Sequence, residues 1–246
     1  MGEMSAGAER LNKLPAPVRR RIDELRKSLE AALGDGLACL LIHGSAARGE
    51  YREGQSDIDV MLVVKDASRG ALASISNALQ LARYAARIEA MILTSAEIPR
   101  AADVFPLLYD DIRRCHIVLS GADPFSALTI SDRHRRLRIE QELREAQIRM
   151  RRAVIDAQGG GEAIAGAVSR KLRQIRGPLR ALLSLRGREV DDALDVVLGE
   201  AGELYRVDVA PLRAVNEAPE AAHDALSGLL AAAVEDVDRM EDGGAA

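Results

Sequence analysis

Two neighbouring stretches decide how this chain folds. Residues 43–50 read His-Gly-Ser-Ala-Ala-Arg-Gly-Glu, and residues 56–64 read Ser-Asp-Ile-Asp-Val-Met-Leu-Val-Val. An apolar run at 37–42 precedes the first stretch, so we predict a strand that turns into a short helix at the Gly-Ser step. Asp57 and Asp59 begin a second strand, and both carboxylates point to the same face because side chains alternate along a strand.

This arrangement has a chemical consequence. Two carboxylates on one face repel each other unless a cation lies between them. Oxygen ligands completed by substrate phosphates are what Mg²⁺ prefers. Gly44 and Ser45 lie between a strand end and a helix start, where free N–H groups and the helix dipole favour a phosphate. The Gly-Lys-Ser/Thr ending of a Walker-type P-loop is absent, so the pattern favours metal-assisted phosphoryl or nucleotidyl transfer.

The segment resembles the signature of the polymerase β-like nucleotidyltransferase superfamily: an apolar strand, Gly-Ser, a spacer, and Asp-x-Asp between apolar residues. It is most similar to the small bacterial branch, which contains kanamycin nucleotidyltransferase-like resistance enzymes and the minimal nucleotidyltransferases paired with HEPN toxins. The strong match covers residues 40–64, and a weaker similarity extends to about Pro124.

The resemblance implies roles for individual residues. Asp57 and Asp59 would be catalytic residues that hold one or two Mg²⁺ ions bridging the phosphates of the nucleotide. Gly44 and Ser45 would bind the departing pyrophosphate portion. Arg48 would add a guanidinium to the same phosphates, or stand as a solvated helix residue.

Two further candidates complete this set. The superfamily uses a third acid on a later strand, and Glu89 is the candidate, as metal ligand or as base for the acceptor hydroxyl. A carboxylate in an otherwise apolar strand is costly to bury, which favours a functional role for Glu89. Alternation places Glu89 on the same face as Met91 and Leu93. The alternative is that Glu89 lies at a strand end in solvent. Ser56 either caps the turn before Asp57 or contacts phosphate, and the sequence leaves both open.

Helices and strands alternate over the first 125 residues, which predicts an α+β domain with a small mixed sheet. Helical periodicity takes over after Pro124, with an interruption at Gly177-Pro178 and two or three more helices between residues 191 and 240. We therefore expect a catalytic domain at 1–126 followed by an all-α helical bundle domain at 127–246.

The helical half carries one more candidate. Lys171 is one of four lysines and the only one after Lys65. In resistance enzymes of the family that this chain resembles, a lysine of this domain can contact the nucleotide phosphates. The resemblance therefore makes Lys171 a nucleotide-binding candidate, and the alternative is an ordinary surface lysine. Residues 188–246 hold fifteen acids against four arginines. This surplus complements a cationic acceptor such as an aminoglycoside, or is the surface of an ordinary acidic bundle.

Composition excludes several classes of protein. The 246 residues carry a formal net charge of −4 with few aromatic side chains, which disfavours a nucleic-acid partner. No apolar run approaches the ~20 residues of a membrane helix. Cys39 and Cys115 are too few for a disulfide framework or a structural zinc site, and we interpret them as two buried thiols within strands. We expect a cytoplasmic protein with no membrane partner.

The most direct hypothesis is an adenylyltransferase-type enzyme with Mg²⁺ as its cofactor. It would move a nucleoside monophosphate, AMP from ATP, onto a hydroxyl of a small-molecule or protein acceptor. The alternative is an antitoxin-like or regulatory binding module, including a catalytically degenerate nucleotidyltransferase fold. The base preference, the acceptor and the oligomeric state, a homodimer included, stay open, because a fold does not fix its substrate.

Overall fold

The computed structural model describes residues 6–242 and divides into two compact units between Ile130 and Ser131. The first unit is an α+β domain and the second is entirely helical, which confirms the predicted fold class. Separate roles for residues 1–126 and 127–246 stay a prediction. Among the described residues, no helix has the length and apolarity that a membrane span requires.

A mixed four-stranded sheet forms the centre of the first unit, with strand order β3-β2-β1-β4. The strands are β1 (Leu37–His43), β2 (Ile58–Val64), β3 (Ile88–Thr94) and β4 (Ile117–Gly121). β1 runs antiparallel to β2 and β4, whereas β3 runs parallel to β2. Both central strands are nearly continuous apolar runs because side chains of both faces are buried.

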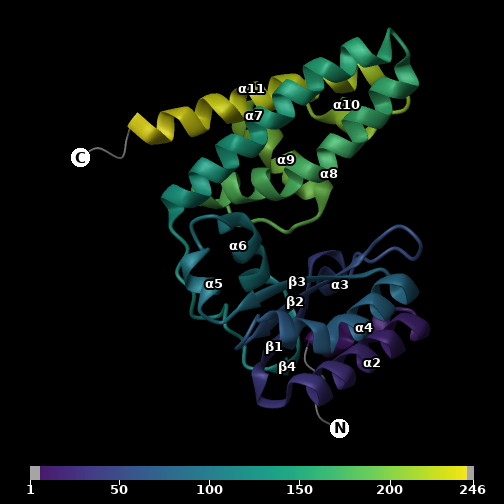
Figure 1. Cartoon of the computed structure of the whole chain (residues 1–246). Helices are drawn as coiled ribbons and strands as arrows, with labels where there is room; N and C mark the ends of the chain where they lie inside the picture. Colours follow the sequence, from purple (N-terminus) through teal and green to yellow (C-terminus); the bar gives the residue numbers. More distant parts are fainter. Residues whose placement is uncertain (1–5, 243–246) are drawn as a thin grey trace. The chain divides into compact units, whose positions relative to one another are not determined.

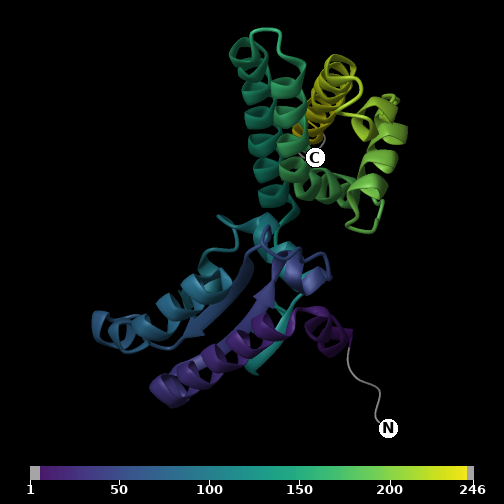
Figure 2. The same cartoon turned by 90° about the vertical axis from the view of Figure 1, so that its right-hand side faces the viewer.

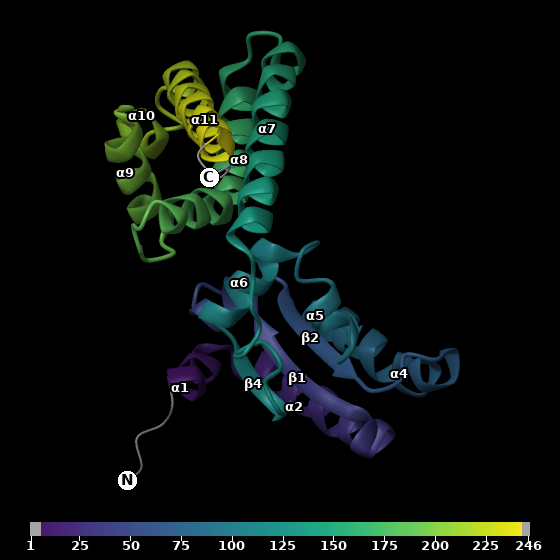
Figure 3. The same ribbon diagram turned by 90° about the vertical axis from the view of Figure 1, so that its left-hand side faces the viewer.

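The helices of the first unit cover both faces of this sheet. They are α1 (Ala6–Lys13), α2 (Ala16–Leu33), the 3₁₀ turn η1 (Gly34–Gly36), α3 (Gly44–Arg48), α4 (Arg69–Ala86), α5 (Glu97–Arg100) and α6 (Pro106–Arg114). Helices α2 and α4 lie side by side on one face, where Leu40, Ile42 and Leu62 enter their core (Figure 1). On the other face, Leu41 and Met61 pack against a second core that α5 and α6 cover (Figure 3).

The helical unit consists of α7 (Asp132–Ala157), α8 (Gly161–Leu185), α9 (Leu194–Tyr205), α10 (Ala210–Arg213) and α11 (Pro219–Asp242). Helices α7 and α8 form a long pair joined by a short turn, and α11 packs against both (Figure 2). The buried side chains of these helices are mostly leucine, isoleucine, valine and alanine, and Met150 of α7 is also buried.

The predicted interruption at Gly177-Pro178 is wrong, because α8 continues through Pro178. A proline inside a helix costs about 3 kcal/mol. Leu179 and Leu182, which follow it, are 1% and 0% exposed. Burying each leucine contributes roughly 2 kcal/mol, so the packed face of the helix outweighs the lost hydrogen bond.

The interpretation of two buried thiols within strands holds for one residue. Cys39 lies in β1 and is fully buried, whereas Cys115 is half-buried and follows α6 at the turn before β4. Neither of these two cysteines forms a disulfide within residues 6–242. Cys115 lies outside the strand because α6 ends at Arg114 and β4 begins only at Ile117.

Candidate active site

The turn between β1 and α3 is built on two glycines. His43 ends β1 in an extended conformation, and Gly44 starts α3 at a φ of +67°. Gly49 ends the helix at a φ of +83°. Positive φ values suit glycine, which has no Cβ.

Gly44 also lies directly against Asp59. A Cβ at residue 44 would collide with the Oδ2 atom of Asp59 and lie 3.3 Å from its Cγ. The structure therefore brings the predicted phosphate-binding turn and one predicted metal ligand into direct apposition, although 15 residues of sequence separate them.

The three predicted acids gather at one end of the sheet. Asp59 lies opposite Glu89 in the parallel pair β2–β3 and opposite His43 in the antiparallel pair β1–β2. Glu89 shares its face with Met91, which packs against the α5–α6 core, as alternation predicts. Asp57 precedes β2 by one residue instead of lying in it.

Several negative charges act on Asp59 at this end of the sheet. Burial raises the pKa of Asp59 above its ordinary value, and the negative charges of Asp57, Glu89 and Asp111 raise it further. Arg48 acts in the opposite direction. Carboxylates that penalise one another's ionisation are the donor set that a divalent cation would stabilise.

Two arginines hold part of this donor set. Arg87 donates from Nε to Oδ1 of Asp57 at 2.7 Å, and Arg83 pairs with Oε1 of Glu89 at 3.0 Å. Each arginine thus engages one carboxylate oxygen of its acid. No three acidic, histidine or cysteine side chains of the described chain converge as a ready metal cluster. The carboxylate oxygens of Asp57, Asp59 and Glu89 suit Mg²⁺ by their chemistry, and arginines hold two of these three acids.

Arg48 is not a solvated helix residue. Its side chain is 15% exposed, and it donates to Oδ2 of Asp111 at 2.9 Å and to Oε2 of Glu50 at 3.2 Å. Asp111 lies on α6, 63 residues along the chain, and no sequence pattern points to it. The pair with Asp111 fixes the guanidinium beside the turn, where it also acts on the charge of Asp59.

His43 is neutral in this environment. Burial lowers its pKa to about 4, and the nearby charge of Asp111 opposes that shift. Because His43 lies opposite Asp59, it places an uncharged imidazole beside the site at neutral pH.

The two serines differ in their engagement. The Ser56 hydroxyl accepts a hydrogen bond from the backbone N–H of Arg52 at 3.1 Å, which closes the turn before β2. The Ser45 hydroxyl makes no hydrogen bond to any other part of the described chain, so it is available to a ligand. The hydrogen bond from Arg52 supports the alternative in which Ser56 caps the turn before Asp57. The Ser56 hydroxyl can still donate its own proton to a ligand.

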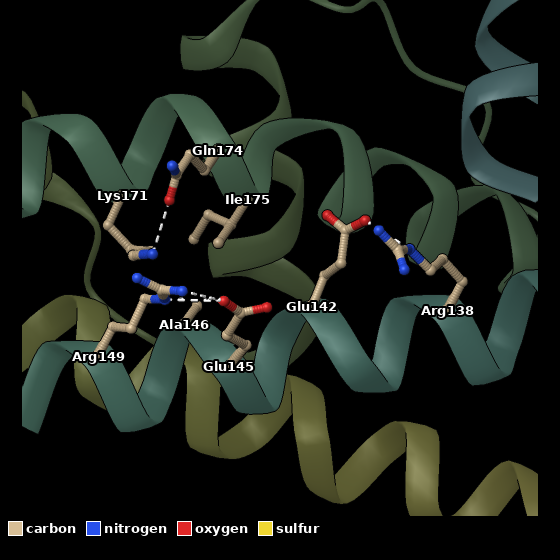
Figure 4. Close-up of a pocket in the computed structure, with 8 residues that line it drawn as sticks. All are labelled: Arg138, Glu142, Glu145, Ala146, Arg149, Lys171, Gln174 and Ile175. Atoms are coloured by element: carbon tan, nitrogen blue, oxygen red, sulfur yellow. Dashed lines mark hydrogen bonds and ion pairs between the residues drawn. The ribbon is translucent and has the colours of Figure 1, made fainter. Parts of the chain in front are cut away.

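Lys171 lies in α8 of the helical unit, in a cavity between α7 and α8 (Figure 4). It is 9% exposed, which excludes a surface lysine. Its ammonium donates to Oε1 of Gln174 at 2.6 Å.

Comparison with known proteins assigns the class of the first unit. Residues 22–119 match the family model described as a nucleotidyltransferase domain. The resemblance to the polymerase β-like superfamily is confirmed for this part of the chain, which holds the turn and all three acids.

One solved structure extends the likeness to both units. It is a spectinomycin adenyltransferase from Enterococcus faecialis, solved with ATP and spectinomycin, to which the chain aligns with a TM-score of 0.51 and 14% sequence identity. The alignment covers 89% of this chain and 98% of that one. At this identity the likeness establishes the fold alone. A search of curated proteins gave no match.

Proposed function

We propose that this protein is a Mg²⁺-dependent nucleotidyltransferase that moves AMP from ATP onto an acceptor hydroxyl and releases pyrophosphate. One observation carries the proposal: within a nucleotidyltransferase domain, the Gly44 turn lies against the Asp59 carboxylate at the end of the sheet. A phosphate held on the turn would therefore lie beside the acids that hold the metal.

The turn would bind the pyrophosphate portion of the nucleotide. Backbone N–H groups at Gly44 and Ser45 and the unengaged Ser45 hydroxyl are the donors. Arg48, fixed beside the turn by Asp111, would add its positive charge to the same phosphates. Ser56 is a further candidate for phosphate contact.

The acids would hold the metal and the acceptor proton. Asp57 and Asp59 are the first ligands, with Glu89 as the third acid opposite Asp59. When bound, Mg²⁺ supplies positive charge that offsets the charge developing on the phosphate oxygens. The acceptor oxygen bonds to the α-phosphorus, the bond from that phosphorus to the α–β bridging oxygen breaks, and the proton of the acceptor hydroxyl passes to the free oxygen of Glu89.

The acceptor is proposed to be a small molecule or a protein that presents a hydroxyl. The matched adenyltransferase was solved with spectinomycin, which supports a small-molecule acceptor, and an aminoglycoside-like compound is the specific version. The acidic surplus of residues 188–246 is compatible with a cationic acceptor. Lys171 stays a nucleotide-binding hypothesis, and a cytoplasmic location and a homodimer stay predictions.

The test is transfer of label from α-labelled ATP in the presence of Mg²⁺. The protein is incubated with a cell extract, which is then separated into protein and small-molecule fractions. The Asp57→Asn/Asp59→Asn double variant is compared with Asp103→Asn, which removes an exposed acid of the same unit. Label that enters one fraction with wild type and Asp103→Asn, and not with the double variant, supports the proposal and identifies the class of acceptor. Absence of label in both fractions contradicts it.

A binding module without transfer is the second candidate. It is favoured by the arginine pairs of Asp57 and Glu89, which leave no three ligating side chains converged within residues 6–242. A degenerate domain of this kind would bind nucleotide by calorimetry and give no labelled product, and a partner protein would then be sought.

A further inference from the structure

A segment without regular secondary structure, residues 50–57, joins α3 to β2 and carries Asp57 at its end. Within it, the backbone N–H groups of Gln55 and Ser56 donate to the carbonyl of Arg52 at 3.1 and 2.9 Å. The backbone N–H of Arg52 donates in return to the Ser56 hydroxyl at 3.1 Å. These hydrogen bonds close a turn on itself, so the position of the turn relative to the sheet depends on contacts with other segments.

Arg87 supplies such contacts from the end of α4. Its Nε donates to Oδ1 of Asp57 at 2.7 Å, and its Nη1 donates to the backbone carbonyl of Gly54 at 2.9 Å. Its own carbonyl accepts from the backbone N–H of Ile58, the first residue of β2, at 3.0 Å. One residue thus ties the turn, a candidate metal ligand and the start of a central strand to the end of α4.

The backbone of Arg87 adopts the left-handed conformation, with a φ of +52°. Its N–H donates to the carbonyls of Ala82 and Arg83, which ends α4. Glycine suits this conformation best, and a residue with a Cβ is strained there. Gln158 and Arg206 end α7 and α9 in the same way, so the conformation belongs to the helix end. The contacts with the turn distinguish Arg87 from both.

Two opposite effects of the guanidinium on metal binding at Asp57 can be compared. The side chain of Arg87 is 52% exposed, so water and salt screen its repulsion of a cation, and the effect is less than about fivefold in affinity. Ordering the backbone of a free turn costs roughly tenfold in an equilibrium constant for each residue. A ligand that meets an ordered turn does not bear this cost. Holding the turn in place is therefore the larger effect.

We propose that Arg87 is a positioning residue that holds the 52–57 turn so that Asp57 lies beside Asp59. The inference rests on the proposed function where it assigns Asp57 to the metal. The ordering of the turn by Arg87 does not depend on the transfer reaction and can be measured without it.

The test compares Arg87→Gly with Arg206→Gly in the full chain. Arg87→Gly removes the guanidinium and relieves the left-handed backbone. Arg206→Gly is the matched control, because Arg206 is an exposed arginine that ends α9 at a φ of +55°. The control should unfold at or above the wild-type temperature, and Arg87→Gly should stay folded, because glycine is favoured at both helix ends.

Hydrogen exchange of the backbone amides reports the order of the turn. The amides of Gln55 and Ser56 are hydrogen-bonded within it. We expect them to exchange at least tenfold faster in Arg87→Gly than in wild type, and at the wild-type rate in Arg206→Gly. Arg87→Lys keeps the charge but lacks the two-pronged guanidinium, so its exchange should be intermediate.

Binding of Mn²⁺ with ATP, followed by electron paramagnetic resonance, is the second readout. We expect at least fivefold weaker binding of Mn²⁺ by Arg87→Gly, and wild-type binding by Arg206→Gly. This readout needs neither an acceptor nor turnover.

Unchanged exchange at Gln55 and Ser56 in Arg87→Gly overturns the proposal. Tighter Mn²⁺ binding by that variant also overturns it, since Arg87 would then compete with the metal, as expected of a binding module. If wild type transfers no label while the turn of Arg87→Gly exchanges faster, the proposed function fails and the positioning role of Arg87 stands.

Discussion

Replacing Gly44 with alanine should separate the two functions of this glycine, its backbone conformation and its contact with Asp59. The added Cβ would stand at a φ of +67° and would collide with the Asp59 carboxylate. Gly49→Ala is the control, because Gly49 has a φ of +83° and open space around its missing Cβ. Both variants therefore carry the backbone penalty, and Gly44→Ala alone displaces the acid.

The expected magnitudes follow from these two contributions. Alanine in the left-handed region costs roughly 1 kcal/mol. Forcing Asp59 away from its rotamer costs about 1 kcal/mol more. We therefore expect the free energy of unfolding to fall by about 1 kcal/mol in Gly49→Ala and by about 2 kcal/mol in Gly44→Ala.

The effect on transfer should be larger than the effect on stability. A reacting group displaced by 1 Å can cost on the order of 100-fold in rate. Chemical denaturation measures the stabilities, and the initial rate of label transfer measures the activity. Gly44→Ala should lose about two orders of magnitude in rate, and Gly49→Ala less than about threefold. Equal losses of stability in the two variants, or a Gly44→Ala enzyme as fast as Gly49→Ala, would show that the contact with Asp59 does not position this acid.

Three further predictions concern pH and packing. The pKa of Asp59 is higher in the folded protein than in the unfolded chain, so the folded protein binds this proton more tightly. Ionisation of Asp59 therefore lowers the free energy of unfolding as the pH rises above about 3.8. Metal-free Asp59→Asn should therefore be more stable than wild type at pH 7, with the difference vanishing at low pH; a less stable variant at pH 7 would contradict this. His43 has a folded pKa of about 4 against 6.5 unfolded, so its contribution, about 3 kcal/mol, is present above pH 6.5 and lost as pH falls to 4. The stability of His43→Gln should lack that part of the acid dependence, and an unchanged profile would count against the assignment. Gly202→Ala places a Cβ 2.8 Å from Cγ1 of Val209 and should destabilise the protein by about 2 kcal/mol, whereas Gly228→Ala, in open space on α11, should stabilise it by up to about 1 kcal/mol. Calorimetric unfolding of both variants checks this pair, and a Gly202→Ala protein as stable as Gly228→Ala would refute it.

The sheet and its turn were predictable because their signals are local. The apolar runs of β1 and β2 and the step at Gly44 specify strand, turn and strand without reference to the rest of the chain. The position of Glu89 beside Asp59 follows from strand alternation and from the parallel register of β2 and β3. Alternation could be predicted from the sequence, whereas the register could not.

What sequence patterns could not supply are the long-range partners of the charged residues. Asp111 holds Arg48 across 63 residues, and Arg87 holds Asp57 across 30, and neither pair has a spacing rule. The continuity of α8 through Pro178 depends on tertiary packing, which outweighs local propensity. The burial of Lys171 likewise follows from how α7 and α8 pack, and not from the composition around it.

We propose that Asp57 and Asp59 hold divalent metal together with nucleotide, and binding of Mn²⁺ as a paramagnetic substitute for Mg²⁺ tests this most directly. Electron paramagnetic resonance counts bound Mn²⁺ for wild type, the Asp57→Asn/Asp59→Asn variant and the Asp103→Asn control, with and without ATP. We expect one or two ions bound by wild type and control when ATP is present, and loss of that binding in the double variant. Mn²⁺ bound equally by the double variant would contradict it.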